Sequence, residues 1–302
     1  VPVLRRPPRP VGARLPPRQR VPPLTGTQPD PLDLLTVLSA GDLEVTGRVV
    51  GASNTTLLAR CSLGGVSLPC VYKPVAGEAP LWDFPDGTLA GREVAASLVS
   101  TAAGWGVVPP TVLREGEVGL GSVQAWVGPD PGATGEDEEL PAPGGGVIDV
   151  VAPSAVPPGW REVVRGEGWG GEPVVLCHAD DPSLVRMAVF DAVVNNADRK
   201  GGHVLRGLDG SVRGIDHGLT FHEDPKLRTV LWGWAGERFD DDVVALLEAT
   251  AAALDGELAE RLSQLLSDDE LLAAELRVER LLARGRFPKP APGGRALPWP
   301  PF

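Results

Sequence analysis

The sequence is poor in the residues and motifs by which several protein classes are identified. It has only three cysteines in 302 residues, and no two of them form a Cys-x-x-Cys pair. A sparse, odd set of cysteines indicates a reducing compartment and argues against a zinc ribbon, so we expect a cytoplasmic protein. No run of about 20 apolar residues occurs, so no transmembrane segment is expected. The first residues also lack the apolar core of a secretory signal.

Motifs for several kinds of ligand are missing or incomplete. No Gly-Lys-Ser/Thr of a Walker loop, no Gly-x-Ser-x-Gly elbow and no His-Glu-x-x-His is present. Residues 166–171, "GEGWGG", match Gly-x-Gly-x-x-Gly, but a dinucleotide site needs a helix to begin in the glycines. The residues that follow, "EPVVLCHA", are typical of a strand. Cys177-His178 has no second pair at ligand spacing, so packing in the core is expected for it.

Positive charge is concentrated at one end of the chain. Residues 1–30 contain six Arg, nine Pro and one acid, which predicts a disordered basic arm. The rest has 22 basic and 39 acidic residues. A body this acidic repels nucleic acid, so no nucleic-acid partner is expected. The arm offers a route to peripheral membrane contact, and a solubilising tail is the plainer interpretation.

The pattern of strands and helices predicts an α+β protein with a β-rich N-lobe and a mostly helical C-lobe. Three β-like runs follow a short helix that Gly41 stops, and "TVLREGEVGLGSVQAWVG" has the pattern of a hairpin. A helix over "GTLAGREVAASLVSTAAG" is inserted between them. We expect, in order, the basic arm (1–30), the N-lobe (31–128), an acidic Pro/Gly-rich loop (129–146), the C-lobe (147–287) and an extended tail (288–302).

The expected C-lobe has clear helix and turn signals. Short strands at "GVIDVVA" and "EPVVLCHA" precede a helix with Asp181 as its N-cap and Pro182 at its first position. A hairpin that turns at Asp209-Gly210 follows. Three helices come after Asp240, the last with a capping-box signature.

Lysine is rare, with only four among 28 basic residues, and one of the four has an unusual place. Lys73 lies in the middle of the apolar strand "PCVYKPV", where an ammonium is costly unless it is paired. Glu93, in the helix "LAGREVAASLV", is its natural partner. Such a pair directs an ammonium at nucleotide phosphates in kinase-like folds. The alternative is a lysine at a sheet edge with an unrelated surface glutamate.

The polar stretch "NNADRKGGHVL" and the later "GIDHG" supply a second set of chemical groups. Phosphoryl transfer needs a carboxylate that orients the acceptor hydroxyl, ligands for a divalent metal, and basic groups on the phosphates. Asp198, then His203, then Asp216 after a hairpin have that order. Each acid alone is explained as a helix cap or a turn residue. Caps and turns do not explain why the two acids occur together with Lys73 and Glu93.

These segments resemble the phosphatidylinositol 3-/4-kinase-like superfamily. "CVYKPVAGE", "LAGREVAASLV", "GSVQAWV", "FDAVVNNADRKGGHVL" and "GIDHGLTF" occur in the order found there, over residues 42–225. They look closest to the type II phosphatidylinositol 4-kinase branch and its bacterial relatives, and the composition is similar to that of an uncharacterised actinobacterial group. The resemblance implies an atypical two-lobed protein/lipid-kinase-like fold. It also implies an ATP-dependent kinase that uses Mg²⁺ or Mn²⁺ and an unidentified hydroxyl acceptor.

The resemblance also implies roles for individual residues. Lys73 would contact the ATP phosphates and Glu93 would brace it, while Asp198 would be the catalytic acid and Asp216 the metal-binding acid. The adenine hinge would consist of Gln124, Ala125, Trp126 and Val127. A turn over the phosphates would consist of Ser53, Asn54 and Thr55.

One position departs from the family pattern, because His203 stands where a metal-binding Asn is usual. Neutral imidazole binds divalent ions but favours softer metals than Mg²⁺. The chain is then an active enzyme with altered metal preference, a slow enzyme, or a nucleotide-binding pseudokinase. Transfer of AMP on the same fold is a further alternative. Because few basic residues lie in the candidate activation segment, residues 217–240, a protein or small hydroxylated acceptor is as well supported as a phosphoinositide.

Overall fold

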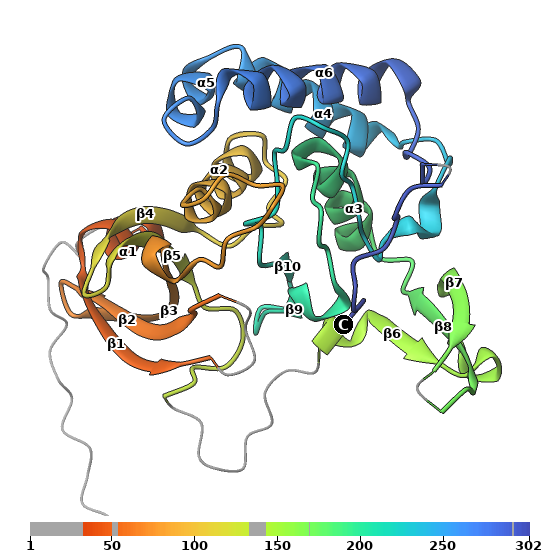
Figure 1. Ribbon diagram of the computed structural model, residues 1–302, viewed down its shortest axis with the longest axis horizontal. Coiled ribbons are helices and arrows are strands. Elements are labelled where there is room, and N and C mark those ends of the chain that lie inside the picture. The colour runs from red at the N-terminus through yellow and green to blue at the C-terminus, as the bar shows by residue number, and fades with distance from the viewer. Residues whose placement is uncertain (1–32, 50–53, 133–142, 169, 292) are drawn as a thin grey trace, which may run out of the picture. The chain divides into compact units, whose positions relative to one another are not determined.

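The computed structural model describes residues 33–49, 54–132, 143–168, 170–291 and 293–302. The expected basic arm, and Ser53 of the expected phosphate-covering turn, lie outside these residues. The described chain has the α+β, two-lobed architecture that the sequence predicts. A β-rich region comes first and a mostly helical region follows (Figure 1).

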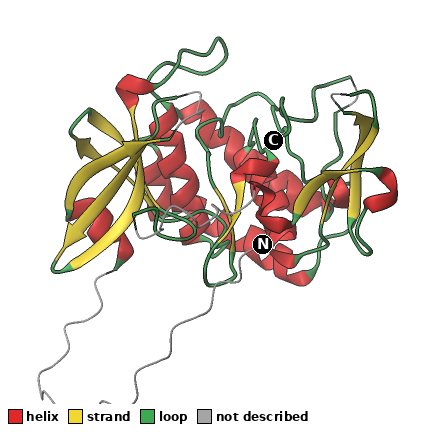
Figure 2. Cartoon of the chain, turned by 90° about the horizontal axis from the view of Figure 1, so that it is seen from below, coloured by secondary structure: helices red, strands yellow, loops and turns green. Residues whose placement is uncertain are grey.

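The N-terminal region is an antiparallel sheet with the strand order β1-β2-β3-β5-β4, coloured yellow in Figure 2. Its strands are β1 (Asp42–Arg48), β2 (Leu57–Leu63), β3 (Val66–Pro74), β4 (Thr111–Gly116) and β5 (Gly119–Ala125). Helix α1 (Leu34–Ala40) buries Val37 and Leu38 in one apolar cluster with Tyr72 and Val123 of the sheet. The turn η1 (Val75–Gly77) and helix α2 (Leu89–Ala102) follow β3. The hairpin of β4 and β5 confirms the sequence prediction.

The C-terminal region contains two small sheets and four helices. A three-stranded sheet has the order β6-β8-β7, and a hairpin joins β9 to β10. The strands are β6 (Ile148–Val151), β7 (Arg161–Glu167), β8 (Pro173–His178), β9 (Val204–Arg206) and β10 (Val212–Gly214). The helices are α3 (Pro182–Val194), α4 (Asp241–Leu254), α5 (Glu257–Leu262) and α6 (Asp268–Arg284). Short 3₁₀ turns are η2 (Pro143–Gly146), η3 (Pro153–Ala155), η4 (Gly201–His203) and η5 (Trp232–Trp234).

Local sequence signals set most of these boundaries. Asp181 caps α3 by accepting a hydrogen bond from Ser183 N, with Pro182 at the first helical position. The Ser267 and Glu270 capping box begins α6 as expected. Strand β7 was not expected. Five of its seven residues are exposed and four are charged, so it lacks the apolar alternation that identifies a strand.

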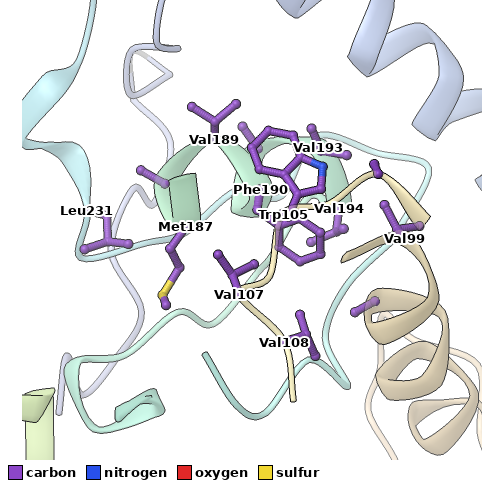
Figure 3. Close-up of a cluster of buried hydrophobic side chains, with 14 of the residues drawn as sticks. Val99, Trp105, Val107, Val108, Met187, Val189, Phe190, Val193, Val194 and Leu231 are labelled. Atoms are coloured by element: carbon purple, nitrogen blue, oxygen red, sulfur yellow. The ribbon is translucent and has the colours of Figure 1, made fainter. Parts of the chain in front are cut away.

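Helix α3 lies in the centre of the main core. Nine of its residues are buried, and Trp105 packs against Phe190 with ring centroids 5.8 Å apart (Figure 3). Trp105 also donates a hydrogen bond from Nε1 to Thr250 Oγ1 of α4, so its one polar atom is satisfied. A helix buried on nearly all sides is a rigid support for the polar loop that follows it.

Among the described helices, none is long and apolar enough to cross a bilayer.

Candidate active site

The candidate site is centred on Lys73, near the end of β3. Its Nζ lies 2.5 Å from Glu93 Oε1 of α2 and 2.9 Å from Asp216 Oδ1 in the loop after β10. Burial opposes the positive charge, but the carboxylates of Asp216 and Glu93 outweigh it and raise the pKa of Lys73. Lys73 is therefore protonated at neutral pH. Its ammonium joins three elements that are far apart in the sequence.

The two carboxylates that contact Lys73 have different environments. Glu93 is almost fully buried, and this burial raises the pKa of its carboxyl although Lys73 opposes the shift. About half of the Asp216 side chain is exposed, and the Lys73 ammonium lowers the pKa of Asp216. Asp216 is therefore ionised at neutral pH and accessible to a ligand. Its backbone is left-handed, with φ 60°, which is uncommon outside glycine and typical of strained functional loops.

The polar loop at residues 195–203 begins where α3 ends. Asn195 is the left-handed C-cap of α3, and Asn196 Oδ1 accepts a hydrogen bond from Asp198 N at 3.0 Å. Asp198 Oδ2 lies 3.3 Å from Lys200 Nζ. Burial raises the pKa of Asp198, and Lys200 opposes that shift. A partly buried carboxylate with a raised pKa is suited to accept a proton from a hydroxyl.

A buried ion pair that the sequence analysis missed fixes this loop to α3. Arg199 and Asp191 have no exposed side-chain surface, and Arg199 Nη2 lies 2.9 Å from Asp191 Oδ1. Arg199 Nη1 also donates to Ile215 O, and Arg199 Nη2 lies 2.6 Å from His217 Nε2. Asp191 accepts a further bond from Thr229 Oγ1. One pair thus holds the loops that carry Asp198 and Asp216. The available signal was an aspartate inside the apolar helix "VRMAVFDAVV".

His203 faces Asp216 across the site. Its Nε2 lies 3.3 Å from Asp216 Oδ2, and burial lowers the pKa of His203 to about 4, so the ring is neutral at pH 7. Its Nδ1 has no hydrogen-bond partner among the described residues. An ionised carboxylate beside a neutral imidazole fits a divalent cation, and Mn²⁺ better than Mg²⁺. Among the described residues, no group of three or more His, Cys, Asp or Glu side chains is placed to hold a metal ion, so further ligands would come from water or a bound molecule.

Helix α2, which carries Glu93, is fixed at its start by two residues that the sequence analysis did not single out. The Glu78 carboxylate accepts hydrogen bonds from Leu89 N at 3.2 Å and Ala90 N at 2.8 Å, so it caps the helix. Arg92 is buried, pairs with Glu270 of α6 and donates to Thr220 O at 2.7 Å. Glu93 is consequently held in place by contacts on both sides of the lobe boundary.

The predicted phosphate-covering turn packs onto the chain just after Lys73. Asn54 Oδ1 accepts a hydrogen bond from Ala79 N, and Thr55 N donates to Gly77 O. Thr55 thereby contacts the turn η1, and Asn54 contacts the chain two residues after it. The Asn54 amide oxygen is therefore occupied by a backbone N–H of the protein, and Thr55 makes its contact through its own backbone N–H.

The predicted hinge comprises the last two residues of β5 and the two residues after it, next to the strand of Lys73. Ala125 pairs in register with Cys70 of β3. The side chain of Gln124 donates to Thr111 Oγ1, and the amides of Ala125 and Trp126 donate to Pro110 O and Pro69 O. Val127 is the first hinge residue whose amide has no bond within the described chain.

The two tryptophans of η5 anchor their segment, since Trp232 Nε1 donates to Ala296 O and Trp234 Nε1 to Asp180 Oδ1.

Comparisons with known proteins identify one relative that covers almost the whole chain. No family model matches the sequence. Protein Rv2133c of Mycobacterium tuberculosis is 50% identical over 266 residues, which is 88% of this chain and 94% of that protein. The crystal structure of a Helicobacter pylori proinflammatory kinase, CtkA, aligns with 81% of this chain and 97% of its own, at 10% identity and a TM-score of 0.37.

Proposed function

We propose a kinase function for this chain, which belongs to the same family as Protein Rv2133c of Mycobacterium tuberculosis. The proposed reaction transfers the γ-phosphate of ATP to a hydroxyl of a lipid, protein or small-molecule acceptor, in the manner of phosphatidylinositol 3-/4-kinase-like enzymes. The observation that supports it is the position of Lys73. Its ammonium contacts both Glu93 and Asp216. The family resemblance implies phosphate binding for Lys73, bracing for Glu93 and metal binding for Asp216.

Each residue would have one task in this reaction. Lys73, braced by Glu93, binds the phosphates, and Asp198 orients the acceptor hydroxyl and accepts its proton. Asp216 and His203 would hold Mg²⁺ or Mn²⁺, which neutralises charge on the phosphates when it is bound. The backbone at Val127 would hold adenine. Most of this arrangement positions groups and stabilises charge, which is what phosphoryl transfer requires.

The decisive experiment is calorimetric titration of ATP into the protein with Mg²⁺ and then with Mn²⁺. We expect metal-dependent binding in the wild type and its loss in Asp216→Asn and Lys73→Met. Asp42→Asn and Lys289→Met are matched controls, because both residues are exposed and neither contacts the site. Failure of the wild type to bind ATP with either metal would rule the proposal out.

A nucleotide-binding pseudokinase is the second candidate, because His203 replaces the usual metal-binding Asn. Both candidates bind ATP, so intact-mass analysis and ADP formation must separate them. A gain of one phosphate or steady ADP release supports the kinase. Binding without either product, whatever the metal, supports the pseudokinase.

A further inference from the structure

The last residues of the chain run across the loops of the candidate site. We call residues 296–302 the C-terminal segment; Figure 1 marks its end beside β9. At its start, Ala296 O accepts hydrogen bonds from Thr229 N at 3.1 Å and from Trp232 Nε1 at 2.9 Å. This end is therefore tied to the chain that follows the Asp216 loop.

The other end of the C-terminal segment contacts the polar loop itself. Pro301 O accepts a hydrogen bond from Gly201 N at 2.8 Å. The Phe302 ring lies directly over Gly201, since a Cβ added there would come within 2.4 Å of its Cε1 and Cζ atoms. The same ring lies over Gly144, where an added Cβ would be 3.4 Å from Cε1. The ring is thus seated between two glycines from different parts of the chain.

The polar loop contains two adjacent glycines at this point. Gly201 and Gly202 stand between Asp198 and His203, and glycine has more backbone freedom than any other residue. The single turn η4 spans these glycines, and Gly202 is open, with nothing within 4 Å of an added Cβ. Arg199 fixes the start of this stretch and Ile215 N bonds to His203 O at its end, so the two glycines between them are its least constrained part unless something contacts Gly201. Pro301 and Phe302 supply that contact.

We propose that Pro301 and Phe302 are positioning residues, which hold the polar loop so that Asp198 and His203 keep their places across the site. The role in the reaction rests on the proposed kinase function, whereas the effect on the loop does not. Neither residue touches the reacting groups; each acts through Gly201.

Two variants disturb this contact, and each has a matched control. Phe302→Ala removes the ring, with Trp299→Ala as the control because Trp299 is 77% exposed in the same segment. Gly201→Ala displaces the ring with a methyl group, with Gly202→Ala as the control at the open neighbouring glycine. We expect hydrogen exchange of the amides at residues 199–203 to become roughly fivefold faster in the first member of each pair, as for loss of one hydrogen bond. Unchanged exchange in both would overturn the proposal.

Kinetics test the consequence for the reaction. In Phe302→Ala, kcat for ADP formation should fall by about tenfold or more, because small misplacements of reacting groups are costly. The KM for ATP and the midpoint of thermal unfolding should stay close to those of Trp299→Ala. Equal losses of kcat, ATP affinity and thermal stability would indicate a general structural role and overturn positioning. A wild type that forms no ADP refutes the kinase function instead, and the exchange experiment still decides whether the segment holds the loop.

Discussion

At the scale of single residues, the site is defined by charges that burial would otherwise disfavour. Lys73 is kept charged by two carboxylates, of which the sequence predicted Glu93 as its partner. His203 shows the opposite effect, because burial keeps its imidazole neutral. One cation and one neutral nitrogen therefore face Asp216 from different directions. This is the arrangement expected if Lys73 binds phosphate and His203 binds the metal ion.

The identity of the metal is the first prediction at this scale. Wild-type protein should form ADP faster with Mn²⁺ than with Mg²⁺, because imidazole prefers the softer ion. His203→Asn should shift the Mn²⁺ to Mg²⁺ activity ratio towards Mg²⁺ by roughly tenfold, since an amide oxygen is a harder ligand. His222→Asn serves as the control outside the site. An unchanged ratio in His203→Asn would show that His203 is not a ligand.

At the scale of secondary structure, α2 carries Glu93 and is held in place by its neighbours. Glu78 caps its N-terminus, and Arg92 joins it to α6 and to Thr220. The Arg92 guanidinium also lies 5.1 Å from the centre of the Phe84 ring. A helix held by a buried charge is fixed in orientation as well as in position. The Lys73–Glu93 contact depends on that orientation.

Removing the charge of Arg92 should lower the free energy of unfolding. Arg92→Met leaves Glu270 without its partner, and breaking a buried ion pair destabilises proteins by about 3–5 kcal/mol. Arg280→Met, at an exposed position on α6, should cost less than about 0.5 kcal/mol. Urea unfolding of both variants measures the difference. Equal midpoints for the two would mean that the Arg92 pair contributes little to stability.

At the scale of the whole molecule, the described chain is acidic and contains two buried histidines, His178 and His217, and one mostly buried histidine, His203. Burial lowers the pKa values of His178, His203 and His217 below that of a free histidine. Arg199 reinforces the shift at His203 and His217, while Asp216 opposes it. The folded protein therefore resists taking up protons that the unfolded chain accepts.

This difference predicts that acid weakens the fold. Between pH 6.5 and the folded pKa of each histidine, the unfolded state binds more protons, so stability falls as pH falls. For His203, with a pKa of about 4, the loss is on the order of 2 kcal/mol at pH 5. Burial raises the pKa values of Glu93 and Asp198, which opposes the trend at lower pH.

The informative measurement is the free energy of unfolding at pH 7 and at pH 5. The wild type should be less stable at pH 5, and His203→Asn should lose less stability over the same interval. If the variant has the same pH dependence as the wild type, the His203 ring is not held neutral by the fold.

Much of the architecture follows from local sequence. The cap of α3, the capping box of α6, the hairpin turn at Asp209-Gly210 and the hairpin of β4 and β5 were predicted, because each depends on residues only a few positions apart. Lys73 was identified because an ammonium inside an apolar strand needs a partner, and an acid in the next helix was the simplest choice. Scarcity of lysine made that signal visible.

Tertiary structure decided which distant groups meet. Arg92 and Glu270 are 178 residues apart, and nothing in either local sequence specifies the other. The same holds for Lys73 with Asp216, and for Phe302 with Gly201. These contacts depend on how helices and strands pack around the core of α3. The sequence by itself therefore determined the elements and the chemical groups, whereas packing determined their partners, because burial makes an unpaired charge costly wherever its partner lies along the chain.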